Sequence, residues 1–201
     1  MKIICIGRNY SEHAKELGNE IPENPVIFLK PDTAILKGKD FYIPEFSKDI
    51  HYELEVVLKI SKGGKYILTE NAHKHYDEIG LGIDFTARDL QNQLKEKGLP
   101  WELAKGFDGS AVVSEFIPKN NFELGQLHFE LKKNQQSVQM GNTNRMLFSF
   151  DEIIAFVSQY FTLRVGDIIF TGTPKGVAKV EENDHLEGYL EGNKILDVWI
   201  C

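Results

Sequence analysis

Short apolar runs, separated by glycine, proline and polar residues, recur along the whole chain of 201 residues. Runs of this kind that are rich in β-branched side chains are typical of β-strands, and the Gly/Pro segments between them are typical of turns. The pattern predicts mainly β structure. The predicted strands are 2–6, 26–30, 50–60, 79–84, 127–131, a buried strand from 166 onward that enters a Gly/Pro loop, and a closing hairpin within 188–199.

A few polar-to-apolar boundaries predict short helices among these strands. Ser149 and Glu152 have the spacing of a capping box, which starts an amphipathic helix. Ser11 is a suitable N-cap for an N-terminal helix that ends at Gly18. The helix after Ser149 should extend to about Tyr160, with Ile153, Ile154, Phe156 and Val157 facing inward.

The predicted strand 50–60 carries an unusual polar pattern. Side chains alternate between the two faces of a strand, so His51, Glu53 and Glu55 are expected to share one face. At about 4 Å and an effective dielectric constant near 20, two carboxylates repel each other by roughly 4 kcal/mol. Two interpretations remain: a well-solvated surface strand, or a positive group between the acids, for which our working hypothesis is a divalent cation.

Other candidate groups lie in three separate segments. His13 and Glu16 are spaced i, i+3 on the predicted N-terminal helix, which fits either a general acid–base pair or a plain surface contact. Asp84 lies near the end of a predicted strand, and Arg88 follows at the start of a helix. Lys105 lies in an apolar, aromatic stretch and is expected to be partly buried beside a partner, because lysine is seldom buried alone.

Two further motifs support only general interpretations. His73 and His75 have a spacing that could hold a metal on a strand, but their polar surroundings favour the start of a solvated helix. The loop 171–177 exposes backbone N–H groups that can hold an anion, although it lacks the spacing of a nucleotide-binding P-loop.

Composition and charge narrow the possible partners. The formal net charge is −7 and no basic run offsets it, which argues against nucleic acid or an anionic membrane as partner. The apolar start is too short for a signal peptide, and no run reaches transmembrane length. The two cysteines do not form a disulfide framework. These features predict a cytoplasmic protein, and its length predicts one β-rich α+β domain over residues 1–201.

Six segments together resemble the fumarylacetoacetate hydrolase family, and most closely its short acylpyruvase and oxaloacetate decarboxylase members. They occur in the family's order over nearly the whole chain, and their combination is far more specific than any one of them. The segments are Gly7-Arg8-Asn9-Tyr10 with His13 and Glu16, Tyr52-Glu53-Leu54-Glu55, Asp84-Phe85-Thr86-Ala87-Arg88-Asp89, Lys105-Gly106-Phe107-Asp108, Gly141-Asn142-Thr143 and Thr171-Gly172-Thr173-Pro174-Lys175-Gly176-Val177.

The resemblance implies a mixed β-roll fold with a few short helices, usually as a homodimer, and a site for Mg²⁺ or Mn²⁺. It also implies a role for individual positions. The implied metal ligands are Glu53, Glu55 and Asp84; the implied catalytic residues are Lys105 and the pair His13 and Glu16, on a lid segment over residues 8–20; the implied substrate contacts are Arg88, Gln91 and Thr173.

These residues predict a reaction on 2-oxo acids. A site of three carboxylates suits a hard cation, and cleavage of an acylpyruvate or of oxaloacetate leaves a pyruvate enolate that a bound metal and Lys105 can stabilise. Hydrolysis also needs an activated water, for which His13, oriented by Glu16, is the candidate base. We therefore expect a metal-dependent C–C bond hydrolase for acylpyruvate-type 2,4-dioxo acids, such as fumarylpyruvate or acetylpyruvate, whose site also permits oxaloacetate decarboxylation.

Two alternatives remain open at this stage. One is an isomerase or decarboxylase of the 2-hydroxyhepta-2,4-dienedioate type, which would use the same enolate chemistry. The other, from a different class, is a non-catalytic β-rich module that holds a structural metal ion and has no use for Lys105, His13 or Glu16.

Overall fold

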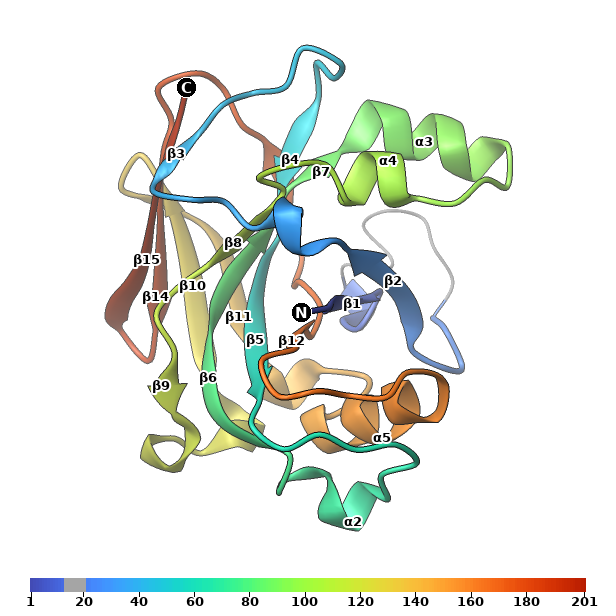
Figure 1. Ribbon diagram of the computed structural model, residues 1–201. Helices are drawn as coiled ribbons and strands as arrows, with labels where there is room; N and C mark the ends of the chain where they lie inside the picture. Colours follow the sequence, from blue (N-terminus) through green and yellow to red (C-terminus); the bar gives the residue numbers. More distant parts are fainter. Residues whose placement is uncertain (13–20) are drawn as a thin grey trace.

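The computed structural model describes residues 1–12 and 21–201, in which three β-sheets carry short helices at their ends (Figure 1). The largest sheet has the strand order β2-β1-β12-β5-β6-β8, and β9 pairs with β6 off this path. Its strands are β1 (Ile3–Gly7), β2 (Val26–Lys30), β5 (Leu54–Ile60), β6 (Tyr76–Asp84), β8 (Ala111–Val113), β9 (Ile117–Pro118) and β12 (Ile168–Phe170).

A second sheet of five strands has the order β11-β10-β14-β15-β3, and a small third sheet has the order β13-β4-β7. Most neighbours are antiparallel, but β1 runs parallel to β12 and β15 runs parallel to β3. The strands are β3 (Asp40–Phe41), β10 (His128–Lys133), β11 (Gln136–Asn142), β14 (His185–Leu190) and β15 (Asn193–Ile200) in the second sheet, and β4 (Ile50–Tyr52), β7 (Thr86–Ala87) and β13 (Ala178–Lys179) in the third.

Helices pack in pairs near opposite ends of the molecule, α3 beside α4 and α2 beside α5 (Figure 1). The predicted capping box at Ser149 and Glu152 is present and starts α5. Ile153, Ile154 and Val157 of that helix are buried as predicted, whereas Phe156 is only partly buried. The helices are α2 (Thr69–Ala72), α3 (Arg88–Glu96), α4 (Glu102–Lys105) and α5 (Phe150–Tyr160), with short 3₁₀ turns η1 (Asp32–Ala34), η2 (Lys119–Asn121), η3 (Leu124–Gln126) and η4 (Thr143–Arg145).

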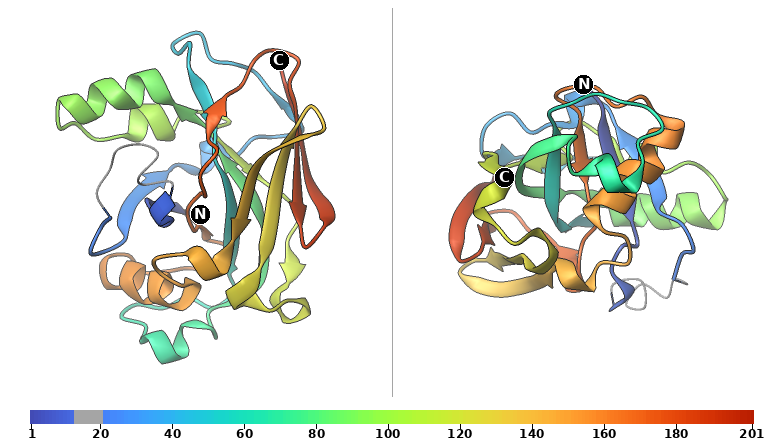
Figure 2. Two further views of the ribbon diagram at one scale, coloured as in Figure 1. Left: turned by 180° about the vertical axis from the view of Figure 1, so that it is seen from behind. Right: turned by 90° about the horizontal axis from the view of Figure 1, so that it is seen from below.

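The main hydrophobic core lies where the second sheet packs on β5 and β6 of the first (Figure 2). Leu54 and Leu81 of the first sheet and Leu131, Leu186 and Leu196 of the second are at most 3% exposed. Burying a side chain of this size is worth about 1.5–3 kcal/mol. This packing makes β5 and β6 a rigid support for the side chains at their ends.

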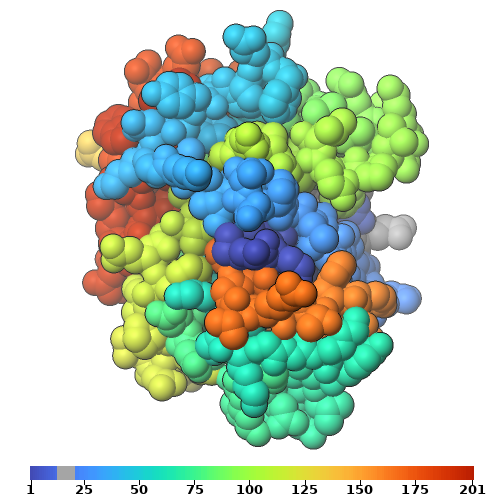
Figure 3. All heavy atoms as spheres, viewed as in Figure 1, coloured from blue at the N-terminus to red at the C-terminus, as the bar shows by residue number. Residues whose placement is uncertain are grey.

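The N-terminal strand β1 lies between β2 and β12 in the first sheet. At the molecular surface, its first residues (dark blue) lie next to the orange segment that precedes β12 (Figure 3). Asp167, in that segment, accepts hydrogen bonds from the backbone N–H groups of Lys2 and Arg164, at 2.8 Å each, and forms an ion pair with the Lys2 side chain. These contacts fix the start of β1, whose other end reaches Gly7.

Two predictions from the sequence need correction. The predicted strand 50–60 is two strands that belong to different sheets. β4, before Glu53, pairs with β7, and β5, after Glu53, pairs with β6. His73 and His75 do not begin a solvated helix. The helix α2 ends before them, and His75 is buried with its Nδ1 atom 2.8 Å from the carbonyl oxygen of Lys62.

Candidate active site

Three carboxylates converge at one end of the β5–β6 pair. Glu53 precedes β5, Glu55 lies within it, and Asp84 ends β6, where its backbone N–H donates to the carbonyl oxygen of Glu53 at 2.9 Å. Carboxylate oxygens of the three residues lie within 4.8 Å of one another. Glu53 is 5% exposed, Glu55 2% and Asp84 0%. The interpretation of the two glutamates as a solvated surface pair is therefore wrong.

Lys105 supplies the positive charge between the acids. Its Nζ atom lies 2.8 Å from Glu53 Oε2 and 2.7 Å from Asp84 Oδ2, and it also donates to Thr86 Oγ1 at 2.6 Å. The side chain is 3% exposed. The prediction that Lys105 is buried beside a partner is confirmed, and α4, which ends at this residue, is the element that places it there.

A second buried lysine, Lys30, supports the same group and was missed from the sequence. Its Nζ atom forms an ion pair with Asp84 Oδ1 at 2.7 Å and donates to the backbone carbonyl of Lys105 and to Ser110 Oγ. Lys30 is 2% exposed. The available signal was a lysine at the end of an apolar strand immediately before Pro31, which alone does not distinguish a buried base from a solvated strand end.

Arg88 is the first residue of α3, and its side chain contacts Glu53 and Gln91. It pairs with Glu53 through its NH2 group, and its NH1 group donates to Gln91 Oε1 at 2.6 Å. Both Arg88 and Gln91 are buried, and they lie one turn apart on the same face of the helix. The Nε atom of Arg88 is buried and has no hydrogen-bond partner in the part of the chain that is described.

The loop after β12 closes the other side of the carboxylates. The backbone N–H of Gly172 donates to Glu55 Oε2 at 2.6 Å. Thr173 is buried, and its hydroxyl accepts a hydrogen bond from Gln139 Nε2 at 2.9 Å. The side-chain Oε1 atom of Gln139 accepts from the backbone N–H of Leu54 at 2.9 Å. Gln139, another residue missed from the sequence, therefore ties this loop to β5 beside the glutamates.

Gly172 is held in a conformation and a space that only glycine fits. Its φ is +105°, and a Cβ atom there would lie 2.6 Å from the Cβ atom of Asn9. We expect Gly172→Ala to lower the free energy of unfolding by about 1–3 kcal/mol and to weaken Mg²⁺ binding, because the loop must shift and the bond to Glu55 with it. Urea denaturation and calorimetry measure the two effects.

Gly38→Ala is the matched control for this variant. Gly38 also has a positive φ, +93°, but a Cβ atom there would meet nothing within 4 Å. It should therefore show the backbone strain without the clash and without any change in Mg²⁺ affinity. Equal behaviour of the two variants would show that the contact between Gly172 and Asn9 has no structural importance.

A pocket opens onto this group. Its walls include the carboxylates of Glu53 and Glu55, the side chain of Lys105, and the aromatic rings of Phe28 and Trp101. Arg88, Gln91 and Thr173, all predicted to contact substrate, line the same pocket, together with Arg8, Lys95, Ile6 and Gly7.

Burial and neighbouring charges shift the pKa values of Glu55 and Lys105. Burial raises the pKa of Glu55, and the negative charges of Asp84 and Glu53 raise it further. For Lys105, burial works to lower the pKa, but the attraction of Asp84 and Glu53 outweighs it, so the pKa is raised and the ammonium form is held. A buried carboxylate with two like charges beside it favours any additional cation.

The residues present fit a divalent metal ion. The donors are three carboxylates with no cysteine or histidine among them, which is the oxygen-only set that Mg²⁺ and Mn²⁺ prefer. Glu53, Glu55 and Asp84 would hold the ion.

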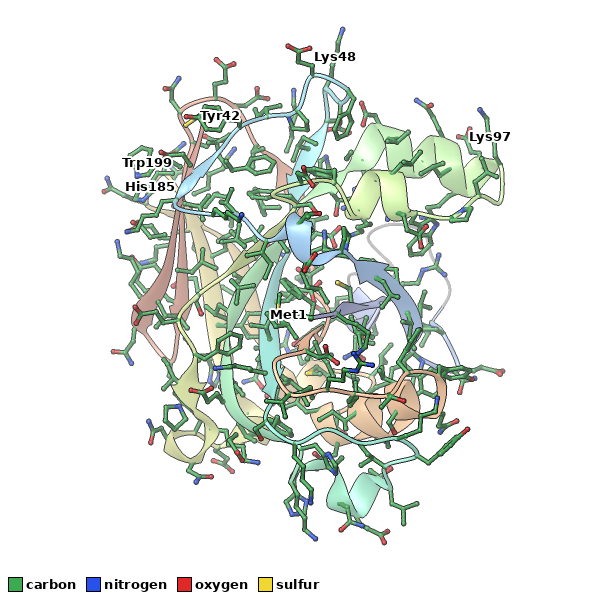
Figure 4. The ribbon with its side chains drawn as sticks, viewed as in Figure 1. Met1, Tyr42, Lys48, Lys97, His185 and Trp199 are labelled. Carbon is green, nitrogen blue, oxygen red and sulfur yellow. The ribbon has the colours of Figure 1, made fainter. Side chains whose placement is uncertain are left out.

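A second group of possible ligands, His185, Glu187 and Asp197, lies on β14 and β15. It differs from the first in its surroundings. His185 Nε2 lies 2.7 Å from Asp197 Oδ1, and Lys194 pairs with Glu187 at 2.9 Å. His185 also stacks flat on Trp199, as Figure 4 shows on the outer face of the second sheet. None of these three residues lines the pocket beside Lys105, so we treat this group as a control and not as a site.

Some predicted residues do not join the site or are not tested by it. His51 belongs to β4, lies 2.9 Å from Asp49 and does not line the pocket. The strand break at Glu53 thus separates it from the glutamates with which it was expected to share a face. His13 and Glu16 lie outside the described residues, so the predicted acid–base pair stays a prediction.

Comparison with known proteins identifies the protein family. The model of the fumarylacetoacetate (FAA) hydrolase C-terminal family matches residues 2–198. The chain belongs to the fumarylacetoacetate hydrolase family. It is 42% identical over 192 residues to the mitochondrial oxaloacetate tautomerase FAHD1 of Homo sapiens, covering 94% of this chain and 87% of the relative. It is 43% identical over 194 residues to a mitochondrial oxaloacetate decarboxylase of Dictyostelium discoideum, covering 95% and 89%.

Among solved structures, the chain resembles a fumarylpyruvate hydrolase from Pseudomonas aeruginosa determined in complex with Mn²⁺ and pyruvate. The TM-score is 0.94 at 34% sequence identity, and the match covers 100% of this chain and 89% of that one. The family and the mixed, strand-rich fold predicted from the sequence are therefore confirmed.

Location and partners are less constrained by these findings. Within residues 1–12 and 21–201, no helix combines the length and apolar character needed to cross a membrane. The two named relatives are mitochondrial. The predictions of a cytoplasmic location and of no nucleic-acid or membrane partner stay predictions.

Proposed function

We propose that this protein is a Mg²⁺- or Mn²⁺-dependent enzyme that hydrolyses a C–C bond of acylpyruvate-type 2,4-dioxo acids. The observation that carries the proposal is the convergence of Glu53, Glu55 and Asp84 beside Lys105, whose ammonium group contacts Glu53 and Asp84. Glu53, Glu55 and Lys105 line one pocket. The family membership supports it, as does the fumarylpyruvate hydrolase with a similar fold. The non-catalytic alternative gives no reason for a buried lysine between the acids.

The 2-oxo acid end of the substrate is assigned to the inner part of the pocket. Arg88, Gln91 and Thr173 are the proposed contacts for its carboxylate, because they line the pocket beside the acids. The buried Nε–H of Arg88 is available as a donor among the described contacts, and a carboxylate would satisfy it. When bound, a divalent cation supplies Lewis-acid stabilisation of negative charge on the substrate oxygens.

Lys105 is the proposed donor to the oxyanion that develops when the C–C bond breaks. Its three N–H groups are all used, by Glu53, Asp84 and Thr86. Substrate binding must therefore exchange one of these hydrogen bonds for a bond to the substrate oxygen. The neutral hydroxyl of Thr86 is the partner that costs least to release, because the two carboxylates interact more strongly with an ammonium.

Hydrolysis further requires a base that takes a proton from the attacking water. The sequence assigns this role to His13, oriented by Glu16, on a proposed lid over residues 8–20 of a single catalytic domain, residues 1–201. The enzyme is proposed to act as a homodimer, which size-exclusion chromatography with light scattering will test.

A second candidate activity is enolisation or decarboxylation of oxaloacetate. The names of the Homo sapiens and Dictyostelium discoideum relatives favour it. Both reactions pass through an enolate of a 2-oxo acid, so they need the same inner pocket but no attacking water. An assay of fumarylpyruvate, acetylpyruvate and oxaloacetate with Mg²⁺ and with Mn²⁺ tests the proposal. Absence of turnover of fumarylpyruvate and acetylpyruvate with either metal would refute the proposed hydrolysis, and absence of turnover of all three would refute both activities.

His13→Ala separates the two activities. We expect acylpyruvate hydrolysis to fall by about 10²–10⁴-fold, the usual contribution of a general base, while oxaloacetate decarboxylation falls far less. Both rates are measured on the same metal-loaded preparation. His73→Ala, a change at an exposed histidine far from the pocket lining, is the control. Equal losses of both activities in His13→Ala would remove the water-activating role.

A further inference from the structure

Gln139 is a buried polar residue that contacts a proposed substrate contact, Thr173, without lining the pocket itself. It lies on β11 of the second sheet and is 1% exposed. Its hydrogen bonds join the second sheet to β5 and to the loop after β12. The direction of each of these bonds, and not only their presence, bears on what the pocket can bind.

Two backbone groups fix the orientation of the Gln139 amide. Its Oε1 atom accepts from the N–H of Leu54 at 2.9 Å, and its Nε2 group donates to the carbonyl oxygen of Pro174 at 3.0 Å. A backbone N–H only donates and a carbonyl oxygen only accepts, so the amide cannot be turned over without losing both bonds. The second N–H of Nε2 therefore donates to Thr173 Oγ1, at 2.9 Å.

This bond determines which way the Thr173 hydroxyl can act. A hydroxyl group has one proton to donate and two lone pairs that accept. Gln139 occupies one lone pair, so the proton must point elsewhere. Among the described residues, the acceptor left for it is the carbonyl oxygen of Pro174 at 3.5 Å, a long contact with an oxygen that Gln139 already uses. Thr173 lines the pocket, so an oxygen atom of a bound molecule is the better acceptor.

The loop that carries Thr173 has other anchors besides Gln139. Thr171, two residues earlier, donates from its hydroxyl to the carbonyl oxygen of Val56 on β5 at 2.8 Å. Its own carbonyl oxygen accepts from Asn9 Nδ2 at 2.7 Å. These contacts hold the loop beside the proposed metal ligands. Loss of Gln139 is therefore expected to change the Thr173 hydroxyl and to leave the metal site in place.

We propose that Gln139 is a positioning residue that keeps the Thr173 hydroxyl turned as a donor towards the carboxylate of a bound 2-oxo acid. The inference rests on the proposed function, because it takes Thr173 to contact that carboxylate. Without Gln139, the carbonyl oxygen of Pro174 is free to take the hydroxyl proton, and the substrate carboxylate, which only accepts, then faces a lone pair. Gln139 excludes this orientation before the substrate arrives, and preorganisation of this kind strengthens binding.

A double-mutant cycle on Gln139 and Thr173 tests the proposal. Thr173→Val removes the hydroxyl, and Gln139→Met removes the amide while keeping the length of the side chain. By calorimetry on the Mg²⁺-loaded enzyme, each is expected to weaken pyruvate binding by about five- to tenfold, and the double variant should bind no more weakly than Thr173→Val alone. Thr173→Ser, which keeps the hydroxyl, should restore most of the loss. Losses that multiply in the double variant, or no loss in Gln139→Met, would overturn the inference.

Mg²⁺ affinity distinguishes positioning of the hydroxyl from general damage to the site. In Gln139→Met, the Kd for Mg²⁺ without pyruvate should change by less than about twofold, because the loop keeps its contacts with Val56 and Asn9. In turnover, the loss should appear mainly in KM and much less in kcat, because the hydroxyl acts on the carboxylate and not on the bond that breaks. A loss of Mg²⁺ affinity as large as the loss of pyruvate affinity would make Gln139 a structural tie only and overturn the inference.

Gln136→Met is the matched control. Gln136 is the first residue of β11 and is exposed, and none of the described hydrogen bonds joins its side chain to the loop. The same substitution there should leave pyruvate binding, KM and Mg²⁺ affinity at their wild-type values. A loss in Gln136→Met equal to that in Gln139→Met would mean that any change on β11 weakens binding, and it would overturn the inference.

Turnover tests the proposed function independently of this cycle. If the wild type turned over none of the 2-oxo acids but the cycle on pyruvate gave the expected pattern, the proposed reaction alone would be refuted. If the substrates were turned over but the losses in the cycle multiplied, the inference alone would be refuted. Absence of pyruvate binding to the Mg²⁺-loaded wild type would refute both.

Discussion

Asp84→Asn is expected to abolish metal-dependent turnover, with kcat/KM lowered by at least about 10³-fold, which corresponds to roughly 4 kcal/mol of lost stabilisation. The substitution keeps the size of the side chain but removes one of the three charges that converge at the site. Asp84 is also the carboxylate that both buried lysines contact, at 2.7 Å each. Its loss therefore removes a proposed metal ligand and the main counter-charge of Lys30 and Lys105 together.

Thermal unfolding with and without Mg²⁺ separates these two effects. A ligand at about 100 times its Kd adds about 2.7 kcal/mol to the stability of the folded state, which for a chain of this length raises Tm by about 5–10 °C. We expect this rise in the wild type and none in Asp84→Asn, whose Tm without metal should also be lower because two buried ammonium groups lose a partner.

Asp197→Asn is the control for this experiment. Asp197 belongs to the other group of possible metal ligands, where Lys39 and His185 already contact it at 2.8 and 2.7 Å. The variant should keep full turnover and the full Mg²⁺-dependent rise in Tm. If Asp197→Asn lost the response and Asp84→Asn kept it, the metal would have to be assigned to the second sheet and the proposed active site abandoned.

Lys105→Met is expected to lower kcat by about 10²–10³-fold, the usual loss when one donor to a developing oxyanion is removed. Methionine keeps most of the length and the apolar stem, so the change is mainly one of charge and hydrogen bonding. The three groups that Lys105 now holds, Glu53, Asp84 and Thr86, lose a common donor. The unloaded protein should therefore be less stable than the wild type.

The response to metal distinguishes this lysine from a metal ligand. In Lys105→Met, Mg²⁺ should still raise Tm, and by more than in the wild type, because the carboxylates have lost a competing positive charge. Lys194→Met, which removes a lysine that contacts Glu187 at 2.9 Å on the outer sheet, should change neither kcat nor the metal response. A Lys105→Met enzyme with full kcat would contradict the proposed role in oxyanion stabilisation.

The balance of charge explains why the site is stable enough to be buried. Three acids, Glu53, Glu55 and Asp84, lie among three bases, Lys30, Arg88 and Lys105, and each base contacts at least one of the acids. Buried charges require partners of this kind, since an uncompensated charge in the interior costs several kcal/mol. The sequence showed the two glutamates and raised the question of their repulsion, but the answer lies in Lys30, Arg88 and Lys105, from three other segments of the chain.

Local sequence patterns were most successful where the structure depends on neighbours in the chain. The capping box at Ser149 and the buried face of α5 follow from contacts within a few residues, and they are observed as predicted. The break at Glu53 was not predictable in this way. It arises because β4 and β5 pair with different partners, β7 and β6, whose positions depend on the whole fold.

The sequence by itself determined the strand-rich fold class and the family, because motif order and hydrophobic pattern are properties of the chain. It also predicted the site residues, of which seven lie in the described part of the chain. Only the tertiary structure decided how these residues are used. It buried the glutamates and brought Lys30, Gln139 and Asn9 to the site through contacts between distant segments. The physical reason is that burial, charge compensation and strain depend on which segments meet in space, and this information is not local to any one of them.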